Sequence, residues 1–344
     1  MAHKKATISD IAVAAGVSKT TVSRYINGRT DLIKPATAER IEKAIQLAHY
    51  QPSAVARSLK TQRSYLVGVV VANIATPFAT SLVGGITAGL AKGGYTPIFA
   101  DAGDSAETER SLVDSLVSHQ IDGLIMNTCA EDNPSLISLA NAGTPVVLVD
   151  REVRDYNFDI VAVPYREPTL RLMDHGRAQG YTRCAFFTQP YEGNSPRRER
   201  LEAYLEGARS TFGAVRPEND VYVVDPWEPE TVDEAARHLA ERLGDGDRVL
   251  VQATNTVTLI AAHNALAKAG LSMPEQAGVC GPDDWGWAHR MGWDWPGLFP
   301  DGVSTYNTDP EAMGLAAAEL LMGRIVDPSG KKERRYVPVR MQLR

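Results

Sequence analysis

Residues 15–28 read Ala15-Gly16-Val17-Ser18-Lys19-Thr20-Thr21-Val22-Ser23-Arg24-Tyr25-Ile26-Asn27-Gly28. Gly16 permits the left-handed backbone of a tight turn, and Ser18 can cap a helix over residues 19–26. Before the turn, residues 7–15 predict another short helix, capped by Thr7 or Ser9. Its apolar residues repeat at helical spacing on one face: Ile8, Ile11, Ala12 and Ala15. Two short helices joined by a glycine turn are typical of a helix-turn-helix.

The second predicted helix carries hydrogen-bonding side chains where a pair of packed helices would gain nothing from them. Lys19, Thr20 and Thr21 occupy its early positions and Arg24 lies further along. In a helix-turn-helix the second helix enters the DNA major groove, where such side chains reach base edges. A third helix over residues 36–49 closes the core with one apolar face, which comprises Ile41, Ala44, Ile45 and Ala48.

Charge is distributed unevenly along the 344 residues. Residues 1–63 contain 11 Lys and Arg against 4 Asp and Glu, a net charge of +7; since the whole chain carries −6, the remainder carries −13. A basic head on an acidic body indicates a polyanionic partner for the head alone. A solvated helix surface with a chance excess of lysine is the alternative that charge by itself leaves open.

Several classes of protein are excluded by composition. No apolar run approaches the roughly 20 residues of a membrane helix, and no apolar segment follows the basic residues at the N-terminus, so we expect neither membrane insertion nor secretion. The three cysteines, Cys129, Cys184 and Cys280, are far apart and lack metal-ligand spacing. They predict a chain without disulfides, metal or cofactor, in a reducing cytoplasm.

From residue 65 onward, short β-branched runs alternate with helical stretches of about 10–16 residues, the pattern of βαβ units on parallel sheets. The first set of predicted strands comprises residues 66–71, 96–100, 123–126 and 146–149, with helices over 78–93, 106–119 and 135–142. The second set comprises residues 160–163, 184–187, 221–224, 249–251 and 278–280, and a further strand is expected over 336–343. The fold class is therefore a small all-α head on an α/β body of two parallel-sheet lobes, with a cleft at the strands' carboxyl ends.

Catalytic chemistry finds no support in this sequence. It contains no nucleophile elbow, phosphate loop, dinucleotide fingerprint or metal motif, and its Gly84-Gly85 and Gly93-Gly94 pairs are expected to serve turns and packing. The histidines of the body are scattered, and single histidines are usually surface or core residues. We therefore expect a protein that is not an enzyme.

The stretch over residues 15–28 resembles the DNA-binding domain of the LacI/GalR family of bacterial repressors. Tyr50-Gln51-Pro52-Ser53-Ala54-Val55-Ala56-Arg57-Ser58-Leu59 is similar to that family's hinge helix. The resemblance implies a helix-turn-helix domain over residues 1–50, a hinge over 51–63, and an effector-binding and dimerisation domain over 64–344.

The same resemblance implies roles for residues of the head and hinge. Lys19 and Thr20 would read base edges, and Arg24 would reach a guanine or a phosphate. The DNA backbone would be held by Thr7, Ser18, Thr21 and Asn27. Leu59, with Ala56 beside it, would wedge into the minor groove and kink the operator. The alternatives are purely structural: Arg24 would pair with a nearby acid, and Leu59 would belong to the core of the body.

The body resembles the family's effector domain, which is similar to periplasmic sugar-binding proteins. The matching stretches are residues 68–78, 121–125, 145–151, 200–204, 281–284 and 303–307; Ala203, Thr256 and Pro282 depart from the usual residues. By this likeness the cleft would be lined by Asn73, Phe78, Asp101, Asp150, Arg151, Arg200, Trp227, Asn255 and Asp283. Arg200 and Asp283 would make the main polar contacts to the effector, and Trp227 would face a sugar ring; surface salt bridges or packed aromatics are the alternatives.

Several arginines are expected near this cleft: Arg151, Arg197, Arg198 and Arg200, although Arg197 and Arg198 could face solvent. A neutral sugar does not require so many cations, whereas a sugar acid uses one as a carboxylate clamp. Residues 50–78 and 283–288 look most like regulators of ketogluconate and related sugar-acid catabolism, which implies 2-ketogluconate or gluconate as effector. The tryptophan-rich stretch over 284–295 is expected at the cleft rim, at a dimer contact, or in a satellite core.

Together these features predict a homodimeric repressor that binds a pseudo-palindromic operator in double-stranded DNA and responds to a sugar or sugar acid. Effector binding would reorient the lobes and withdraw Leu59 from the DNA. The rival interpretation is a carbohydrate-binding protein or a sugar-processing enzyme without a DNA function.

Replacing Arg24 with Ala separates these classes. In a repressor the variant loses about 1–3 kcal/mol of operator binding and keeps its affinity for the effector, because the guanidinium contacts only DNA. Fluorescence anisotropy with operator DNA and calorimetry with the effector measure the two affinities. In a sugar-processing enzyme, turnover by Arg24→Ala would equal that of the wild type.

Overall fold

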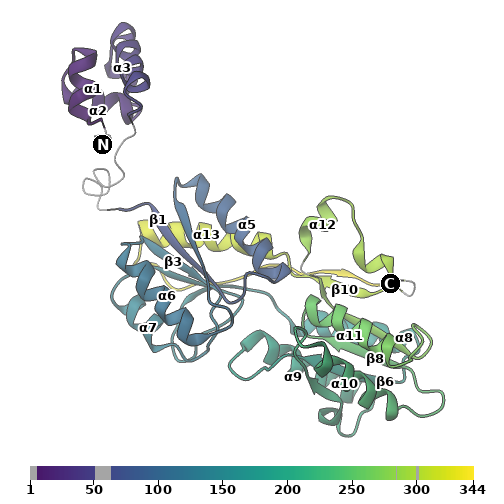
Figure 1. The fold of residues 1–344 in the computed structure, drawn as a ribbon. Coiled ribbons are helices and arrows are strands. Elements are labelled where there is room, and N and C mark those ends of the chain that lie inside the picture. Colours follow the sequence, from purple (N-terminus) through teal and green to yellow (C-terminus); the bar gives the residue numbers. More distant parts are fainter. Residues whose placement is uncertain (1–5, 51–62, 284, 300–301) are drawn as a thin grey trace. The chain divides into compact units, whose positions relative to one another are not determined.

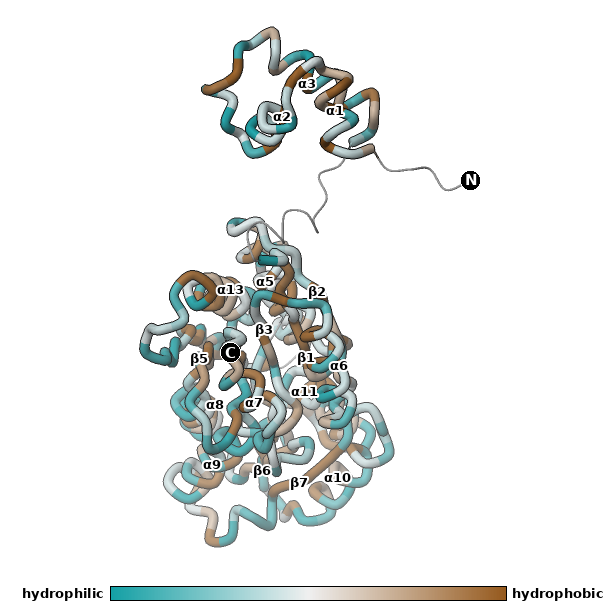
Figure 2. The backbone as a smooth tube through the Cα atoms, turned by 90° about the vertical axis from the view of Figure 1, so that its left-hand side faces the viewer, coloured by the Kyte–Doolittle hydropathy of each residue, from teal (hydrophilic) through white to brown (hydrophobic). Residues whose placement is uncertain are grey.

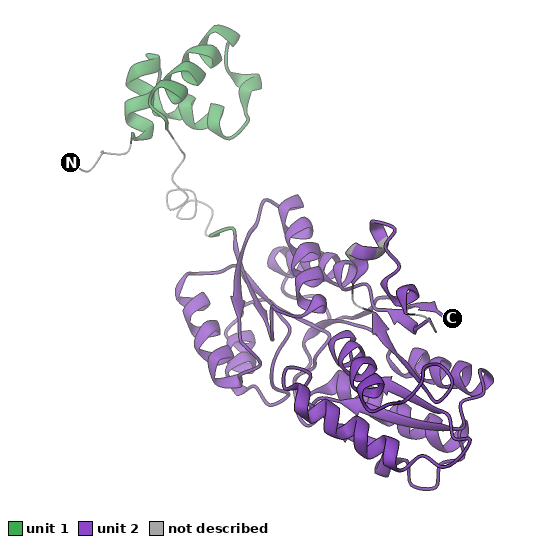
Figure 3. Cartoon of the chain, turned by 45° about the vertical axis from the view of Figure 1, so that its right-hand side comes forward, with its two compact units in different colours: residues 1–65 green, residues 66–344 purple. Residues whose placement is uncertain are grey.

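The computed structural model describes residues 6–50, 63–283, 285–299 and 302–344, and its elements are drawn in Figure 1. Hydrophobic segments lie along the strands of the body, β1 among them, and hydrophilic segments lie at the periphery (Figure 2). The chain divides into two compact units, residues 1–65 and 66–344 (Figure 3). The predicted hinge, with Ala56 and Leu59, lies outside the described residues.

Over its described residues 6–50, the first unit contains three helices and a short 3-10 turn. Their bounds are α1 Ile8–Ala15, α2 Lys19–Ile26, η1 Thr30–Leu32 and α3 Pro35–Leu47. Thr7 and Asp10 form a reciprocal capping box at the start of α1, and Gly16 ends that helix with a left-handed φ of 65°. The predicted helices of the helix-turn-helix are therefore confirmed.

The core of this unit is the one that the apolar spacing predicts, with one exception. Its buried residues are Ile11, Ala12, Ala15, Val22, Ile41 and Ala44. Ala48 was expected on the buried face but is exposed. α3 ends at Leu47, so Ala48 is its C-cap residue and lies outside the helical face that packs on the core.

The second unit is built of two six-stranded sheets. The first lobe has the strand order β11-β5-β4-β3-β1-β2, and the second has β12-β10-β9-β8-β6-β7. In the first sheet the strands are β1 Leu66–Val71, β2 Thr96–Asp101, β3 Gly123–Met126, β4 Val146–Val149, β5 Asp159–Ala162 and β11 Arg334–Tyr336. In the second they are β6 Arg183–Thr188, β7 Val221–Val223, β8 Val249–Ala253, β9 Ala277–Asp283, β10 Ser304–Asn307 and β12 Arg340–Gln342. Neighbouring strands are parallel except β10 and β12.

Helices connect the strands and cover the sheets, as βαβ units require. In the first lobe they are α5 Pro77–Lys92, α6 Ala106–Ser118, α7 Pro134–Asn141 and α13 Pro310–Val326. In the second lobe they are α8 Arg166–Ala178, α9 Ser195–Ser210, α10 Pro229–Glu241 and α11 Thr256–Lys268, with the shorter η2 Pro217–Asp220, α12 Gly286–Arg290 and η3 Trp295–Leu298. The predicted fold class is confirmed.

The prediction of a single strand over residues 336–343 is wrong. Residues 334–342 instead form two short strands in different sheets, β11 beside β5 and β12 beside β10. Pro338 lies between them, and its ring nitrogen cannot donate to a sheet. The chain also changes lobes after β5 and after β10, so three connections join the two lobes.

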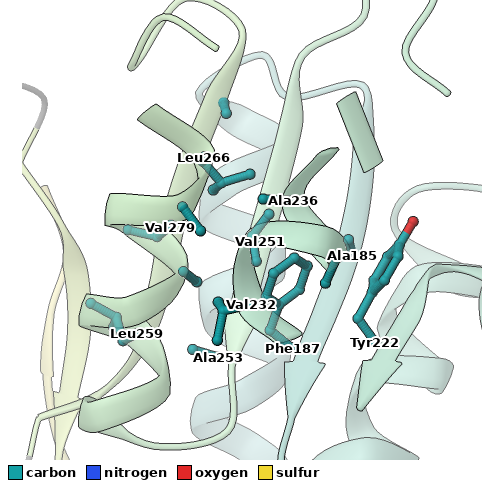
Figure 4. Close-up of a cluster of buried hydrophobic side chains, with 14 of the residues drawn as sticks. Ala185, Phe187, Tyr222, Val232, Ala236, Val251, Ala253, Leu259, Leu266 and Val279 are labelled. Atoms are coloured by element: carbon teal, nitrogen blue, oxygen red, sulfur yellow. The ribbon is translucent and has the colours of Figure 1, made fainter. Parts of the chain in front are cut away.

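Each lobe has its own apolar core. In the second lobe Phe187, Val251 and Val279 of the sheet pack against Leu259 and Leu266 of α11 (Figure 4). The tryptophan-rich stretch belongs partly to this core, since Trp295 is 3% exposed and contacts Trp285 at 5.2 Å between ring centroids. That placement agrees with the satellite-core alternative for Trp295.

Helices α5 and α13 approach each other closely at glycine positions. A Cβ atom added at Gly85 would lie 2.0 Å from the carbonyl oxygen of Glu311, and one added at Gly314 would lie 2.3 Å from that of Leu82. Both obstacles are backbone atoms, which cannot move without shifting a helix. Gly85 is therefore a packing glycine, whereas a Cβ at the exposed Gly84 would meet nothing within 4 Å.

Gly85→Ala is expected to lower the free energy of unfolding of the body by about 1–3 kcal/mol, because the helices must separate to admit the methyl group. The matched variant Gly84→Ala should be neutral or stabilising by about 0.5–1 kcal/mol, since alanine favours a helix over glycine. Urea titration followed by circular dichroism measures both. Equal stabilities for the two variants would contradict the close contact.

Candidate functional site

The exposed surface of α2 carries the side chains predicted to read DNA. Lys19, Thr20 and Arg24 are all exposed, and within residues 6–50 no carboxylate is paired with Arg24. That finding disfavours the interpretation of Arg24 as half of a local salt bridge. The guanidinium of Arg24 is therefore available for a guanine or a phosphate.

The other predicted DNA contacts also serve the local fold of the head. The Ser18 hydroxyl caps α2 by accepting from the Thr21 backbone N–H at 3.1 Å, and lies 2.9 Å from the Thr21 hydroxyl. Asn27 donates to the carbonyl oxygen of Ser23 at 2.6 Å, and Thr7 caps α1. Hydrogen bonds at the helix ends thus fix the positions of these side chains without a contribution from DNA.

Within the body, a pocket lies between the two lobes. The first lobe contributes Ala72, Asn73, Thr76, Pro77, Phe78, Asp104, Asn127, Asp150 and Arg151. The second contributes Gln189, Asn194, Arg197, Arg200, Trp227, Asn255, Thr256 and Val257. Four of these residues come directly after a strand, namely Ala72, Asn127, Asp150 and Gln189, so the pocket lies at the carboxyl ends of both sheets.

Seven of the nine predicted cleft residues line this pocket: Asn73, Phe78, Asp150, Arg151, Arg200, Trp227 and Asn255. Asp101 and Asp283 do not. Asp101 accepts from the backbone N–H groups of Ile74 and Gly103 at 3.1 and 3.2 Å, which shapes the loop beside the pocket. Asp283 is fully buried and accepts from the Trp295 indole N–H at 2.9 Å, so it anchors the tryptophan-rich stretch.

Arg200 is buried and fixed by aromatic residues. Its guanidinium lies 3.7 Å from the centre of the Tyr165 ring, and its Nε donates to the Tyr306 hydroxyl at 3.3 Å. The Tyr165 hydroxyl in turn donates to a carboxylate oxygen of Asp150. Burial and the charge of Asp150 raise the pKa of Tyr165 well above its usual value, so Tyr165 stays protonated and remains a donor.

Asp150 is held in an uncommon backbone conformation. Its φ is 66°, in the left-handed region that favours glycine, although Asp is enriched there among other residues. The turn directs the chain out of β4 and leaves Asp150 and Arg151 adjacent in the pocket wall. Asp150 keeps a second carboxylate oxygen that a ligand hydroxyl could approach.

Of the two other pocket arginines, Arg151 has a distant carboxylate partner and Arg197 has neutral acceptors. Arg151 donates to the Thr128 carbonyl oxygen at 3.1 Å and lies 3.8 Å from the Asp104 carboxylate. Arg197 donates to the Pro190 carbonyl oxygen at 2.8 Å and to the Gln189 side-chain oxygen at 3.1 Å. Burial and the charge of Arg151 lower the pKa of Arg197 to about 10, which leaves it cationic at neutral pH. The pocket thus holds three arginines against two aspartates, Asp104 and Asp150.

Arg197 and Arg198 have different environments. Arg197 lines the pocket, whereas Arg198 pairs at 2.7 Å with Glu131, a buried carboxylate of the first lobe. Close by, the backbone N–H of Glu152 donates to the Ser195 hydroxyl at 2.9 Å. The first turn of α9 therefore contacts both the pocket and the opposite lobe.

Sequence reasoning missed several lining residues, notably Asp104, Asn127, Gln189 and Asn194. Asn127 and Gln189 each come directly after a strand, β3 and β6, and Asp104 follows β2 by three residues. Listing the polar residues after each predicted strand would have found these three. Asn194 caps α9, a role that the sequence also permits one to predict.

The arrangement supports binding. Over the described residues, no group of three or more His, Cys, Asp or Glu side chains could hold a metal ion. The structure likewise has, in its described ranges, no helix long and apolar enough to cross a membrane. Cations, carboxylates, amides and an indole converge on one pocket, which suits a small polar ligand.

Comparison with known proteins identifies the family. The profile "Bacterial regulatory proteins, lacI family" matches residues 7–53, and "Periplasmic binding proteins and sugar binding domain of LacI family" matches residues 64–340. The chain belongs to the LacI family. It is thus a DNA-binding transcriptional regulator with a sugar-binding type of domain.

Relatives of similar length share this LacI-family architecture. The transcriptional regulator KdgR of Bacillus subtilis is 32% identical over 94% of this chain and 92% of its own length. The regulator PtxS of Pseudomonas putida is 32% identical over 96% and 93%, respectively. Both are named as regulators of transcription and not as enzymes.

Solved structures agree with the fold. A complex of the transcriptional regulator CelR with cellobiose is 26% identical, covers 98% of both chains and has a TM-score of 0.69. A Lac repressor dimer bound to operator and an anti-inducer is 20% identical, with 98% coverage of both chains and a TM-score of 0.79. The second likeness supports the fold alone.

Tyr165→Phe tests the buried link between Arg200 and Asp150. Removing the hydroxyl takes a hydrogen bond from a carboxylate and is expected to lower the free energy of unfolding by about 1.5–3 kcal/mol. Tyr156→Phe is the matched control, since its hydroxyl donates at the surface to Asn141 and its loss should cost less than about 0.5 kcal/mol. Chemical denaturation of both variants measures the difference, and equal losses would show that the buried bond is not stabilising.

Proposed function

We propose that this LacI-family protein is a homodimeric repressor whose affinity for a pseudo-palindromic operator is controlled by a sugar acid, with 2-ketogluconate and gluconate as the candidates. The observation that carries the proposal is the pocket between the lobes, where Arg151, Arg197 and Arg200 face Asp104 and Asp150. The excess of one positive charge favours a ligand that brings a negative charge.

The hydroxyl groups of such a ligand have partners in the same pocket. Asp150 offers a carboxylate oxygen, and Asn73 and Asn255 offer amide groups. The indole of Trp227 lies at the wall, 54% exposed, and suits the apolar face of a sugar ring. CelR, whose structure contains cellobiose, supports a carbohydrate-like effector for this fold.

Operator binding rests on the head. Lys19, Thr20 and Arg24 project from α2 and would read one half-site, so a dimer would read two successive half-sites related by symmetry. Leu59 and Ala56 are proposed at the operator centre, where an apolar wedge costs a few kcal/mol and is offset by contacts in the bent DNA. Thr7, Ser18, Thr21 and Asn27 would hold the phosphates.

Control of the operator requires that the effector bind the two states of the repressor unequally. Coupling of this kind is typically about 1–3 kcal/mol, a change in operator affinity of about 5–150-fold. The contacts of α9 with the first lobe could couple the two events. A ligand that bonds Arg197 would shift the helix turn in which Ser195 and Arg198 contact that lobe. We expect induction, in which the effector releases the operator.

Selection of binding sites from random duplex DNA tests the proposal, repeated with 2-ketogluconate, gluconate and neutral hexoses. The expected result is an enriched pseudo-palindrome whose binding weakens with one sugar acid and not with a neutral hexose. Arg24→Ala is the control protein, and it should enrich the palindrome more weakly, with a relaxed preference at the base that Arg24 contacts.

Other outcomes bear on separate parts of the proposal. If a palindrome is enriched and no sugar acid changes its binding, the protein is still a repressor, but its effector is not a sugar acid. Absence of enrichment at low salt would favour the rival, a carbohydrate-binding protein or sugar-processing enzyme without a DNA function.

A further inference from the structure

The three arginines of the pocket differ in how their charge is already satisfied. Arg200 lies on the Tyr165 ring and bonds the Tyr306 hydroxyl, and Tyr165 connects it to the Asp150 carboxylate. Arg151 has the Asp104 carboxylate at 3.8 Å. Arg200 is therefore linked through Tyr165 to one carboxylate of the protein, and Arg151 lies near another.

Arg197 is different. Its partners within the described part of the chain are both neutral acceptors, the Pro190 carbonyl and the Gln189 side chain, and no carboxylate there lies within ion-pair distance. A partly buried cation without an anionic partner is unfavourable, since neutral acceptors replace only part of its lost hydration. An arriving anion would supply the missing charge.

One of these neutral bonds can be exchanged without loosening the pocket. The Gln189 side-chain oxygen accepts from Arg197 and also from Asn255, whose Nδ2 lies 2.5 Å away. If a ligand carboxylate took over from Gln189, the Asn255 amide would still hold that oxygen. Asn194 meanwhile fixes the backbone of Arg197 by accepting from its N–H at 3.2 Å. The side chain can change partners while its base stays in place.

On the basis of the proposed function, we infer that Arg197 binds the anionic group of the effector and is the residue that selects a carboxylate-bearing sugar over a neutral one. The planar guanidinium can donate two parallel hydrogen bonds to a carboxylate, which Lys could not reproduce. The site lies in the first turn of α9, where the helix dipole adds to the attraction for an anion. Arg200, which the sequence predicts together with Asp283 to make the main polar contacts, and Asp150 instead bind hydroxyl groups common to acid and neutral sugars.

Titration calorimetry of the full-length protein tests this assignment with two matched pairs of ligands. 2-Ketogluconate and D-fructose differ by a carboxylate in place of a hydroxymethyl group, as do gluconate and D-glucitol. Arg197→Gln is expected to lower the affinity for the bound acid by about thirty-fold or more, because the carboxylate loses its charged partner. The affinity for the neutral member of the pair should be unchanged.

Two further variants make the result specific. Arg197→Lys keeps the positive charge but cannot donate two parallel hydrogen bonds, so its affinity for the acid should lie between those of the wild type and Arg197→Gln. Arg166→Gln removes an exposed cation of the same lobe that pairs with Glu206 outside the pocket, and should leave the affinity for the acid unchanged. If Arg197→Gln does not fold, as judged by circular dichroism, the loss in Arg197→Lys decides the question.

The outcomes separate this inference from the proposed function. If the wild type binds an acid and both Arg197 variants bind it within about threefold as well, Arg197 is not the clamp and the sugar-acid repressor stands. If the wild type binds neither acid, the proposed effector class fails and the role of Arg197 fails with it. A thirty-fold loss in Arg197→Gln, with Arg166→Gln unchanged, supports both.

Discussion

Parallel strands place all their carboxyl ends at the same edge of a sheet, and this constraint positions the pocket. In one lobe Ala72, Asn127 and Asp150 come directly after β1, β3 and β4; in the other, Gln189 follows β6. Residues separated by more than a hundred positions therefore meet because of strand direction. The three connections between the lobes keep the two edges facing one pocket.

Within that frame, the charges are arranged by short side-chain contacts. Tyr165 links Asp150 to Arg200, because its hydroxyl donates to the Asp150 carboxylate and its ring faces the Arg200 guanidinium. Asn194 and Ser195 begin α9, which carries Arg197 into the pocket and Arg198 to Glu131 of the opposite lobe. A residue that lines the pocket and a contact between the lobes thus share one helical turn, which gives a physical basis for the proposal that an effector acts on lobe geometry.

Sequence reasoning succeeded where the signals are local. Caps at Thr7 and Ser18 and the glycine at position 16 specify the head within a few residues each, and the strands beginning at Leu66, Gly123 and Val146 are bounded as their apolar runs predict. It failed where contacts with neighbouring elements decide which sheet a segment joins. The run over 336–343 is rich in strand-forming residues, yet Pro338 interrupts it and the strands on its two sides belong to different sheets.

By itself, therefore, the sequence determined the helix-turn-helix, the alternation of strands and helices, and the family, because capping, periodicity and motif order are properties of contiguous residues. Only the tertiary structure decided which side chains face the pocket. Asp283 is the last residue of β9, at the edge of the sheet near the pocket, but it is buried and bonded to Trp295. Arg197 lines the pocket, whereas its neighbour Arg198 pairs with Glu131. Such choices depend on packing between distant segments, and packing is not encoded at any one position.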